Sequence, residues 1–452
     1  SGGTAQTTVY IAKIGANGEP QLWHPSGGTR TYWYQDTALP ESRSKFAAVA
    51  YNNRMYILGG LTGAGTPSNT VLSTNTVRYA DVNPTGTLTA FTTTGMQALT
   101  TNRYGLSAQV YNGYVYVMGG DLTFTGTPVN TVQYADLNSD GTMNAWVTTN
   151  TFTTGRMTGG GNFSAIWGAY IYVGGGCTTV NASGYCTALA SDMQLASINA
   201  DGSLATWDSM IGIDNRYFGQ TIVAWQDALY RVGGCGSQDS SSGTCNDPLG
   251  DTVYGVINQD GDASTVGSSS PSATAPCSGA SPTSCDLPSA SVGNVLNESA
   301  IMNGYLYIMG GCTNNACSTV STGVTYQSIA ADGTLTKPGT CTGGSYSDSY
   351  CVSPRNLPAG LAAAATAVFN SRIYLIGGFN TGTNIYYTTV SADGTLSAWT
   401  TNATNIQNLT SASGNAVTTL TYSYAYARAN PTAVATVPGN LYIFGGCEDG
   451  SI

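Results

Sequence analysis

The sequence has little charge, and this shortage argues against two classes of partner. Only 8% of the 452 residues are charged, and 14 Lys and Arg residues stand against 24 Asp and Glu residues, for a net charge of −10. Nucleic acids and anionic membrane surfaces both need clustered cations. No run reaches the length of a membrane-spanning helix, since the longest candidate, residues 359–369, is short and rich in alanine. We therefore expect neither a nucleic-acid partner nor a membrane span in this segment.

Helical periodicity is also missing, whereas residues that suit strands and turns are abundant. The chain contains 58 Gly and 29 Tyr residues, and Thr, Ser and Asn make up much of the remainder. Aromatic and β-branched residues favour pleated surfaces, and Gly and Asn favour turns. The composition predicts an all-β protein.

A five-residue motif recurs along the chain. Tyr-x-x-Gly-Gly occurs seven times, starting at Tyr56, Tyr116, Tyr172, Tyr230, Tyr307, Tyr374 and Tyr442. A fixed motif at irregular spacing indicates structural repeats that carry loops of different length.

The surroundings of the motif repeat as well. A short apolar run precedes it across a tight turn such as the Asn-Gly of "YNGY" (111–114), which is typical of a two-residue β-hairpin. A third strand and a further turn follow, as in "YADLNSDGTMNAW" (134–146). An aromatic residue stands five positions after the turn glycine in five units, at Trp23, Phe91, Trp146, Trp207 and Trp399. Each unit is thus a four-stranded antiparallel meander, which cannot cover its own apolar face alone.

The glycine pair, the Tyr and the Trp at set distances resemble the kelch repeat. This resemblance implies a β-propeller of six or seven blades, and the seven copies of the motif predict seven four-stranded antiparallel blades. The chain starts with a third and a fourth strand (8–15 and 19–25) and ends with a first and a second (431–446), so we expect the two ends to complete one blade together. The predicted blades, which make up a single domain within a longer chain, are blade 1 at about 45–93, blade 2 at 105–149, blade 3 at 161–208, blade 4 at 217–267, blade 5 at 296–337, blade 6 at 361–402, and blade 7 at 431–446 plus 8–25.

All the long connections fall on one face of this propeller, and the cysteines fall there too. The spacing of the cysteines suits short disulfide loops better than zinc knuckles, because the only histidine is His24. The expected pairs are Cys177 with Cys186, Cys235 with Cys245, Cys277 with Cys285, Cys312 with Cys317, and Cys341 with Cys351. Cys447 has no expected partner within this chain; we expect the partner to lie beyond residue 452, and the alternative is that Cys447 pairs elsewhere. Such disulfides indicate an extracellular or cell-surface protein.

Arginines precede the first strand of several units and are candidates for ligand binding. A ring of guanidiniums at the channel mouth could hold a carboxylate or a sulfate, and the alternative is that each arginine binds loop carbonyls of a neighbouring blade. The candidates are Arg43, Arg103, Arg156, Arg216 and Arg428; Arg355 stands somewhat farther from its glycine pair.

Three tyrosines that the repeat does not explain are candidates for glycan or protein contact, because they lie in the cysteine-bounded loops. They are Tyr185, Tyr346 and Tyr350. Asn-x-Ser/Thr sequences make Asn181, Asn297, Asn402 and Asn408 candidates for glycosylation. The Asp-Gly turns are explained by hairpin chemistry rather than by calcium, so we expect no metal and no cofactor.

The leading functional hypothesis is a non-enzymatic extracellular module for recognition or adhesion that presents disulfide-stiffened loops to a glycan or a protein. One alternative is a structural subunit of an extracellular filament or surface layer, whose partners are other copies. A second is a carbohydrate-active enzyme. The kelch resemblance also includes copper radical oxidases, but these need two histidine ligands, and serine–histidine triads fail for the same shortage.

Overall fold

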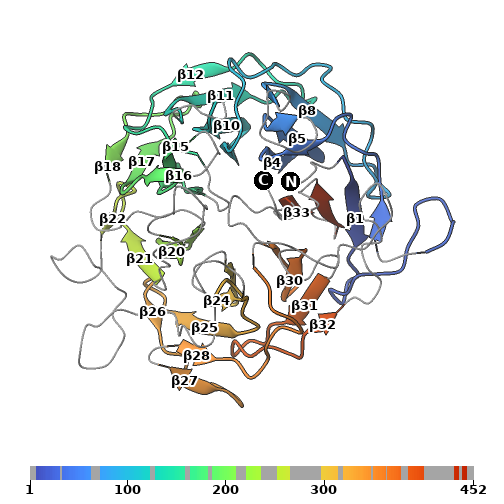
Figure 1. Ribbon diagram of the computed structural model, residues 1–452, viewed down its shortest axis with the longest axis vertical. Coiled ribbons are helices and arrows are strands. Elements are labelled where there is room, and N and C mark those ends of the chain that lie inside the picture. Colours follow the sequence, from blue (N-terminus) through green and yellow to red (C-terminus); the bar gives the residue numbers. More distant parts are fainter. Residues whose placement is uncertain are drawn as a thin grey trace.

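The fold is a ring of small antiparallel sheets around a central axis (Figure 1). The computed structural model describes residues 7–30, 33–62, 72–122, 128–157, 163–181, 186–209, 220–235, 252–264, 297–313, 319–347, 350–362, 364–377, 385–401, 432–436 and 440–444. Every regular element in these ranges is a strand. The prediction of an all-β propeller with seven blades is confirmed.

The first three blades follow the chain in order from the inner strand to the outer one. Blade 1 contains β4 (Ala47–Tyr51), β5 (Arg54–Leu58) and β8 (Val77–Asp81), and a single bridge from Tyr79 to Thr92 occupies the place of a fourth strand. Blade 2 contains β9 (Ser107–Tyr111), β10 (Tyr114–Met118), β11 (Val132–Asp136) and β12 (Val147–Thr149). Blade 3 contains β13 (Ser164–Trp167), β14 (Tyr170–Gly174), β17 (Met193–Ser197) and β18 (Asp208–Ser209).

The next three blades repeat this order. Blade 4 contains β19 (Thr221–Trp225), β20 (Ala228–Val232), β21 (Thr252–Ile257) and β22 (Ala263–Ser264). Blade 5 contains β23 (Glu298–Met302), β24 (Tyr305–Met309), β25 (Val324–Ile329) and β26 (Leu335–Thr336). Blade 6 contains β29 (Ala365–Phe369), β30 (Arg372–Ile376), β31 (Ile385–Thr389) and β32 (Thr400–Thr401).

Blade 7 joins the two ends of the chain. It combines β33 (Thr432–Thr436) and β34 (Asn440–Phe444) with β1 (Val9–Lys13) and β2 (Trp33–Gln35). The predicted outer strand at 19–25 is wrong, because this segment contributes isolated bridges, such as Pro20 to Ile14, and no regular strand. Pro20 and Pro25 supply no N–H group for a ladder, and the regular strand that pairs with β1 is β2, which begins at Trp33.

The tight turns between the first and second strands have the predicted conformation. Asn112 and Gly113 both have positive φ, at 48° and 85°, and Asn303 and Gly304 repeat this at 52° and 76°. Two successive residues in the left-handed region are typical of the turn whose twist matches a β-hairpin. The turn residues therefore fix the register of the inner hairpins.

Seven apolar clusters, one at each boundary between neighbouring blades, form the core. At the boundary of blades 1 and 2, for example, Tyr56 and Leu58 of β5 pack against Val115 and Val117 of β10. Alternate residues of one strand face opposite neighbours, so Ile57 belongs to the cluster shared with blade 7. The period of two along each strand thus serves two interfaces at once.

The tyrosine of the repeated motif links each blade to the next. Its hydroxyl donates to the carbonyl of the turn glycine between the third and fourth strands of the following blade, as in Tyr116 to Gly202 at 2.9 Å. All seven copies make this bond: Tyr56 to Gly141, Tyr116 to Gly202, Tyr172 to Gly261, Tyr230 to Gly333, Tyr307 to Gly394, Tyr374 to Gly18 and Tyr442 to Gly86. The last two bonds pass through blade 7, so the ring of contacts closes where the chain ends meet.

The two faces of the ring differ. The turn face carries the short turns between strands one and two and between strands three and four. The loop face carries the connections from strand two to strand three and from one blade to the next. Small additional elements lie on these loop-face connections: β3 (Arg43–Ser44), β6 (Leu61–Thr62) and β7 (Leu72–Ser73) form one sheet, and β15 (Cys177–Val180) and β16 (Cys186–Leu189) form a hairpin.

Candidate functional site

The glycine pairs mark the point where each second strand enters the loop face. In blade 2, Gly119 and Gly120 have φ values of 61° and 91°, which few side chains tolerate. A Cβ atom on Gly119 would lie 2.4 Å from the carbonyl oxygen of Arg156 in blade 3, and one on Gly120 would lie 2.8 Å from that of Tyr104. The pair is therefore required both by its backbone conformation and by the close approach of two other backbone segments.

Three of the candidate arginines lie inside the blades. Arg43, Arg103 and Arg156 are 0–1% exposed. Each donates from Nη1 to the carbonyl of the first glycine of its own blade's pair, for example Arg103 to Gly119 at 3.1 Å. Each also donates to the residue before strand three, which is Thr76, Thr131 or Asp192, and Arg156 binds the carboxylate of Asp192 with Nη2–Oδ1 at 2.8 Å.

These arginines are structural, contrary to the prediction that they hold a ligand. Each binds loop carbonyls of its own blade with its side chain, and not those of a neighbour as the alternative proposed. The link to the neighbour is made by the main chain instead: Gly60 donates to the carbonyl of Arg103, and Gly120 to that of Arg156. Sequence spacing could not reveal this, because a buried arginine and an exposed one have the same spacing.

The other candidate arginines are not part of a described ring. Arg355 is exposed, and its carbonyl accepts a hydrogen bond from the indole of Trp399 at 2.9 Å. In blade 6 the main-chain role of the arginine belongs to Leu361, whose carbonyl accepts from Gly311. Arg216 and Arg428 lie outside the described residues.

The residue that follows each glycine pair begins a second layer on the loop face. In blades 1 to 3 these residues are Leu61, Asp121 and Cys177, and each pairs with the residue after the buried arginine, namely Ser44, Tyr104 and Met157. The disulfide between Cys177 and Cys186 closes the β15–β16 hairpin in this layer.

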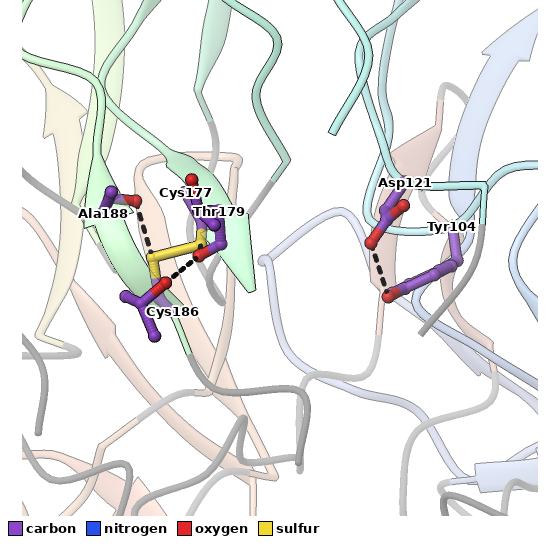
Figure 2. The surroundings of a disulfide bond; sticks show 7 residues. Tyr104, Asp121, Cys177, Thr179, Cys186 and Ala188 are labelled. Atoms are coloured by element: carbon purple, nitrogen blue, oxygen red, sulfur yellow. Dashed lines mark hydrogen bonds between the residues drawn. A yellow bond between two sulfur atoms is a disulfide. The ribbon is translucent and has the colours of Figure 1, made fainter. Parts of the chain in front are cut away.

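An apolar cluster joins this layer across three blades. Leu61, Tyr104, Met157, Cys177 and Val180 pack together, and all are less than 10% exposed. Figure 2 shows the disulfide hairpin and the Tyr104–Asp121 pair in the same region. The loops of blades 1 to 3 therefore have a small core of their own, separate from the clusters between the blades.

Polar groups lie beside this cluster. The hydroxyl of Tyr104 donates to Oδ2 of Asp121 at 3.1 Å, and both side chains are buried. The ammonium of the half-buried Lys45 lies 5.7 Å from the centroid of the Tyr104 ring, within the range of a cation–π contact. None of these residues carried a sequence signal beyond its position next to an arginine or a glycine pair.

A second disulfide hairpin lies at the rim of blade 5. Cys341 is bonded to Cys351, and β28 (Tyr350–Val352) pairs with β25, with β27 (Ser345–Ser347) outside it (Figure 1). Tyr350 is fully buried and donates to Oγ1 of Thr252 in blade 4 at 3.1 Å. Its prediction as an exposed contact residue is wrong, because residues in a strand alternate sides and Tyr350 faces the neighbouring blade.

The remaining cysteine predictions are met in part. The pairs Cys177–Cys186 and Cys341–Cys351 are confirmed. Cys235 and Cys312 are disulfide-bonded, and their expected partners, Cys245 and Cys317, lie outside the described residues. So do Cys277, Cys285 and Cys447, the whole of Tyr185 and the side chain of Tyr346.

The candidate glycosylation sites differ in access. Asn297 is only 5% exposed, so the folded protein does not present it to a glycosylating enzyme. Asn181 is half-buried next to the β15–β16 hairpin. Asn402 and Asn408 lie outside the described residues.

The Asp-Gly turns hold their carboxylates with local donors. Asp201 accepts from the main-chain N–H and the hydroxyl of Ser203, at 3.0 and 2.6 Å, and these bonds lower the pKa of Asp201. Asp140, Asp332 and Asp393 repeat the arrangement with a threonine. Among the described residues, no three His, Cys, Asp or Glu side chains are grouped so that they could hold a metal ion.

Among the described carboxyl groups, Glu298 has the pKa that is raised furthest above its ordinary value. It is 9% exposed at the start of β23, the inner strand of blade 5, and its Oε2 accepts from the hydroxyl of Thr366 in blade 6 at 2.8 Å. Burial raises the pKa of Glu298 to about 7, against the opposing effect of the bonds from Thr366 and the N–H of Ala364.

Within the described part of the chain, no helix is long and apolar enough to cross a membrane.

Comparisons with known proteins agree with this fold. Residues 42–73, the range that includes β3 to β7, match the family model described as the kelch motif. No curated protein matches the chain. Among solved structures, the chain titled "Structure of YjhT" is 15% identical with a TM-score of 0.45, over 79% of this chain and 98% of that one. The protein is thus a β-propeller of seven antiparallel blades that carries a kelch motif at residues 42–73.

Proposed function

We propose that this propeller is a non-enzymatic extracellular module for recognition or adhesion, and that its loop face binds a glycan or a protein. The observation that carries the proposal is the second layer on blades 1 to 3. There a disulfide hairpin, an apolar cluster and a small sheet hold the loops in one arrangement. Loops that are ordered before binding lose less conformational entropy when a partner binds.

The chemistry of the loops supports the same conclusion. Disulfides persist in oxidising surroundings outside the cytosol, and four of the described cysteines besides Cys177 and Cys186 are also disulfide-bonded. Rigid loops on a propeller scaffold combine variable surface residues with a constant core, which is the usual place of binding sites.

A pair of charge insertions tests which face binds. Thr187→Arg adds a long cation to the exposed side of β16 on the loop face, and Ala200→Arg adds the same group to an exposed turn on the turn face of the same blade. The purified protein would be screened against an array of immobilised glycans and against intact cells. We expect Thr187→Arg to lower binding at least tenfold and Ala200→Arg to leave it unchanged.

Three outcomes would overturn the proposal. Equal loss in both variants would remove the loop face as the binding surface. Ordered self-association of the purified protein would favour an assembly subunit, and hydrolysis of an oligosaccharide would favour a carbohydrate-active enzyme.

A further inference from the structure

Glu298 lies at a boundary where the equivalent residues of other blades are not ionisable. It pairs with Met309, the residue just before the glycine pair of blade 5. The corresponding residue is Ala47 in blade 1, Ser107 in blade 2, Thr221 in blade 4 and Ala365 in blade 6. At the boundary of blades 2 and 3 the contact is between two neutral hydroxyls, with Ser107 Oγ 2.5 Å from Ser164 Oγ. A carboxyl group replaces a small neutral side chain at this one boundary among those described.

No cation compensates the carboxyl group within the described part of the chain. Its hydrogen-bond donors are the hydroxyl of Thr366 and the main-chain N–H of Ala364, both from blade 6 or the connection into it. The titratable groups in the apolar cluster of the same blade boundary are phenols from β24, β25 and β31, and Asp393 interacts with Tyr305 and Tyr307 from the turn face. These phenols are Tyr305, Tyr307, Tyr326 and Tyr386. Ionised Glu298 is therefore a buried charge without an opposite charge, which is costly.

The segment that Glu298 touches is anchored to the loop face of blade 5. The carbonyl of Leu361 accepts from Gly311 at 2.6 Å, and the N–H of Leu361 donates to Ser321 at 3.1 Å. Gly311 immediately precedes the disulfide-bonded Cys312. A Cβ atom on Gly310 would lie 2.3 Å from the carbonyl oxygen of Leu361, so the two backbones are in direct contact. The main chain of Leu361, which leads into blade 6, therefore contacts the start of the Cys312 loop.

We propose that Glu298 is a proton-operated latch between blades 5 and 6, which holds the inner strand of blade 6, β29, against the inner strand of blade 5, β23, when protonated and loosens it when ionised. In the protonated form the carboxyl group is neutral and matches its buried position. In the ionised form the charge gains hydration only if the boundary between the two blades opens to water. The latch acts on the loop face, but it does not depend on the recognition function, because its effect is visible without a ligand.

The sign of the pH dependence follows from the direction of the pKa shift. The pKa of Glu298 is raised from 4.5 in the unfolded chain to about 7 in the folded protein. Its contribution to stability is therefore fully present below the lower value and is lost as the pH rises through the higher one. This difference corresponds to an increase of about 300-fold in the unfolding equilibrium constant across that range.

Hydrogen–deuterium exchange of the full chain, corrected for the intrinsic exchange rate, tests the latch. We expect the peptides that cover residues 298–302 and 364–369 to lose protection between pH 5.5 and pH 8.5, at least tenfold more than the corresponding peptides of blade 2. In Glu298→Gln, which is neutral at every pH, this loss should disappear. Asp208→Asn changes an exposed carboxylate on the rim of blade 3 and should behave as the wild type.

A second variant distinguishes the latch from a general folding defect. Thr366→Val removes a donor that favours the ionised form, so it should move the transition to higher pH while the low-pH state stays protected. Loss of protection that is the same in the wild type and in Glu298→Gln would overturn the latch. So would a wild-type protein whose blade 5 and blade 6 peptides do not respond to pH, or a Thr366→Val transition at lower pH.

Discussion

The turn face and the loop face are the two ends of the same set of strands, yet one repeats and the other does not. On the turn face, seven tyrosines bind seven turn glycines in the same way around the whole ring. On the loop face, the residue after the glycine pair is Leu61, Asp121 or Cys177, and each leads into a different local structure. A contact that recurs in every blade holds the ring together, whereas a position that varies between blades shapes the loops of its own blade.

The buried arginines stand between these two regions. Arg43, Arg103 and Arg156 repeat with the blades, like turn-face contacts, but they lie at the base of the loop face and fix where the varied loops begin. Repetition in sequence therefore indicated a structural role even for a charged residue. Four sets of variants test how the two faces differ.

Removal of a buried arginine should have the largest effect. Arg156→Ala leaves Asp192 and the carbonyls of Gly175 and Asp192 without their buried donor, and we expect a loss of about 3–5 kcal/mol in the free energy of unfolding. Urea unfolding measures it. The exposed Arg355→Ala serves as control and should change the value by less than about 0.5 kcal/mol. Equal effects in the two variants would contradict the structural role.

Loss of the blade 3 disulfide should act on the loop face alone. Cys177→Ser with Cys186→Ser removes a cross-link over a short loop, which we expect to cost about 2–3 kcal/mol in the local stability of the β15–β16 hairpin. Limited proteolysis should then cut within residues 177–189 while the blades remain intact. The matched double variant at Cys341 and Cys351 should leave the hairpin of blade 3 resistant. Unfolding of the whole propeller in the first variant would show that the two layers are not separable.

Loss of one turn-face bond should cost less. Tyr116→Phe leaves the carbonyl of Gly202 without its donor, and the expected loss is about 1–2 kcal/mol in the free energy of unfolding. Tyr134, which stacks on Tyr116, provides the control, because Tyr134→Phe removes a hydroxyl for which no bond to the protein is found among the described residues. If the two variants lose the same stability, the effect comes from packing and not from the bond.

The turn aspartates should give the smallest effect, and only in acid. Local donors lower the pKa of Asp140, Asp201, Asp332 and Asp393, so their contribution is present above the ordinary pKa of aspartate and is lost as the pH falls through the lowered values. A variant with all four changed to Asn should show a smaller drop in thermal midpoint between pH 5 and pH 2.5 than the wild type. An unchanged drop would exclude these turns as a source of acid sensitivity.

Much of the fold could be predicted from the sequence, because its signals are local. The turn of "YNGY", the glycine pairs and the tyrosine each act within a few residues of themselves, and the copies that the structure describes agree. The outer strand of blade 7 could not be placed in the same way, since an insertion separates Trp23 from the segment that pairs with β1. The candidate site was predicted less well. In the sequence, Tyr350 looks like a loop residue. It is buried because β28, the strand that contains it, pairs with β25 and directs its side chain towards blade 4.

The number of blades, the places of the loops and the short disulfide pairs that are described could be predicted from sequence alone, since each depends on residues close together in the chain. Which polar residues are buried depends on the tertiary structure. The spacing of Arg103 is explained by a carbonyl 16 residues away, and the state of Glu298 by a threonine 68 residues away. Burial and hydrogen bonding depend on which segments the ring brings together, and the local sequence does not show which distant segment will lie beside a given residue.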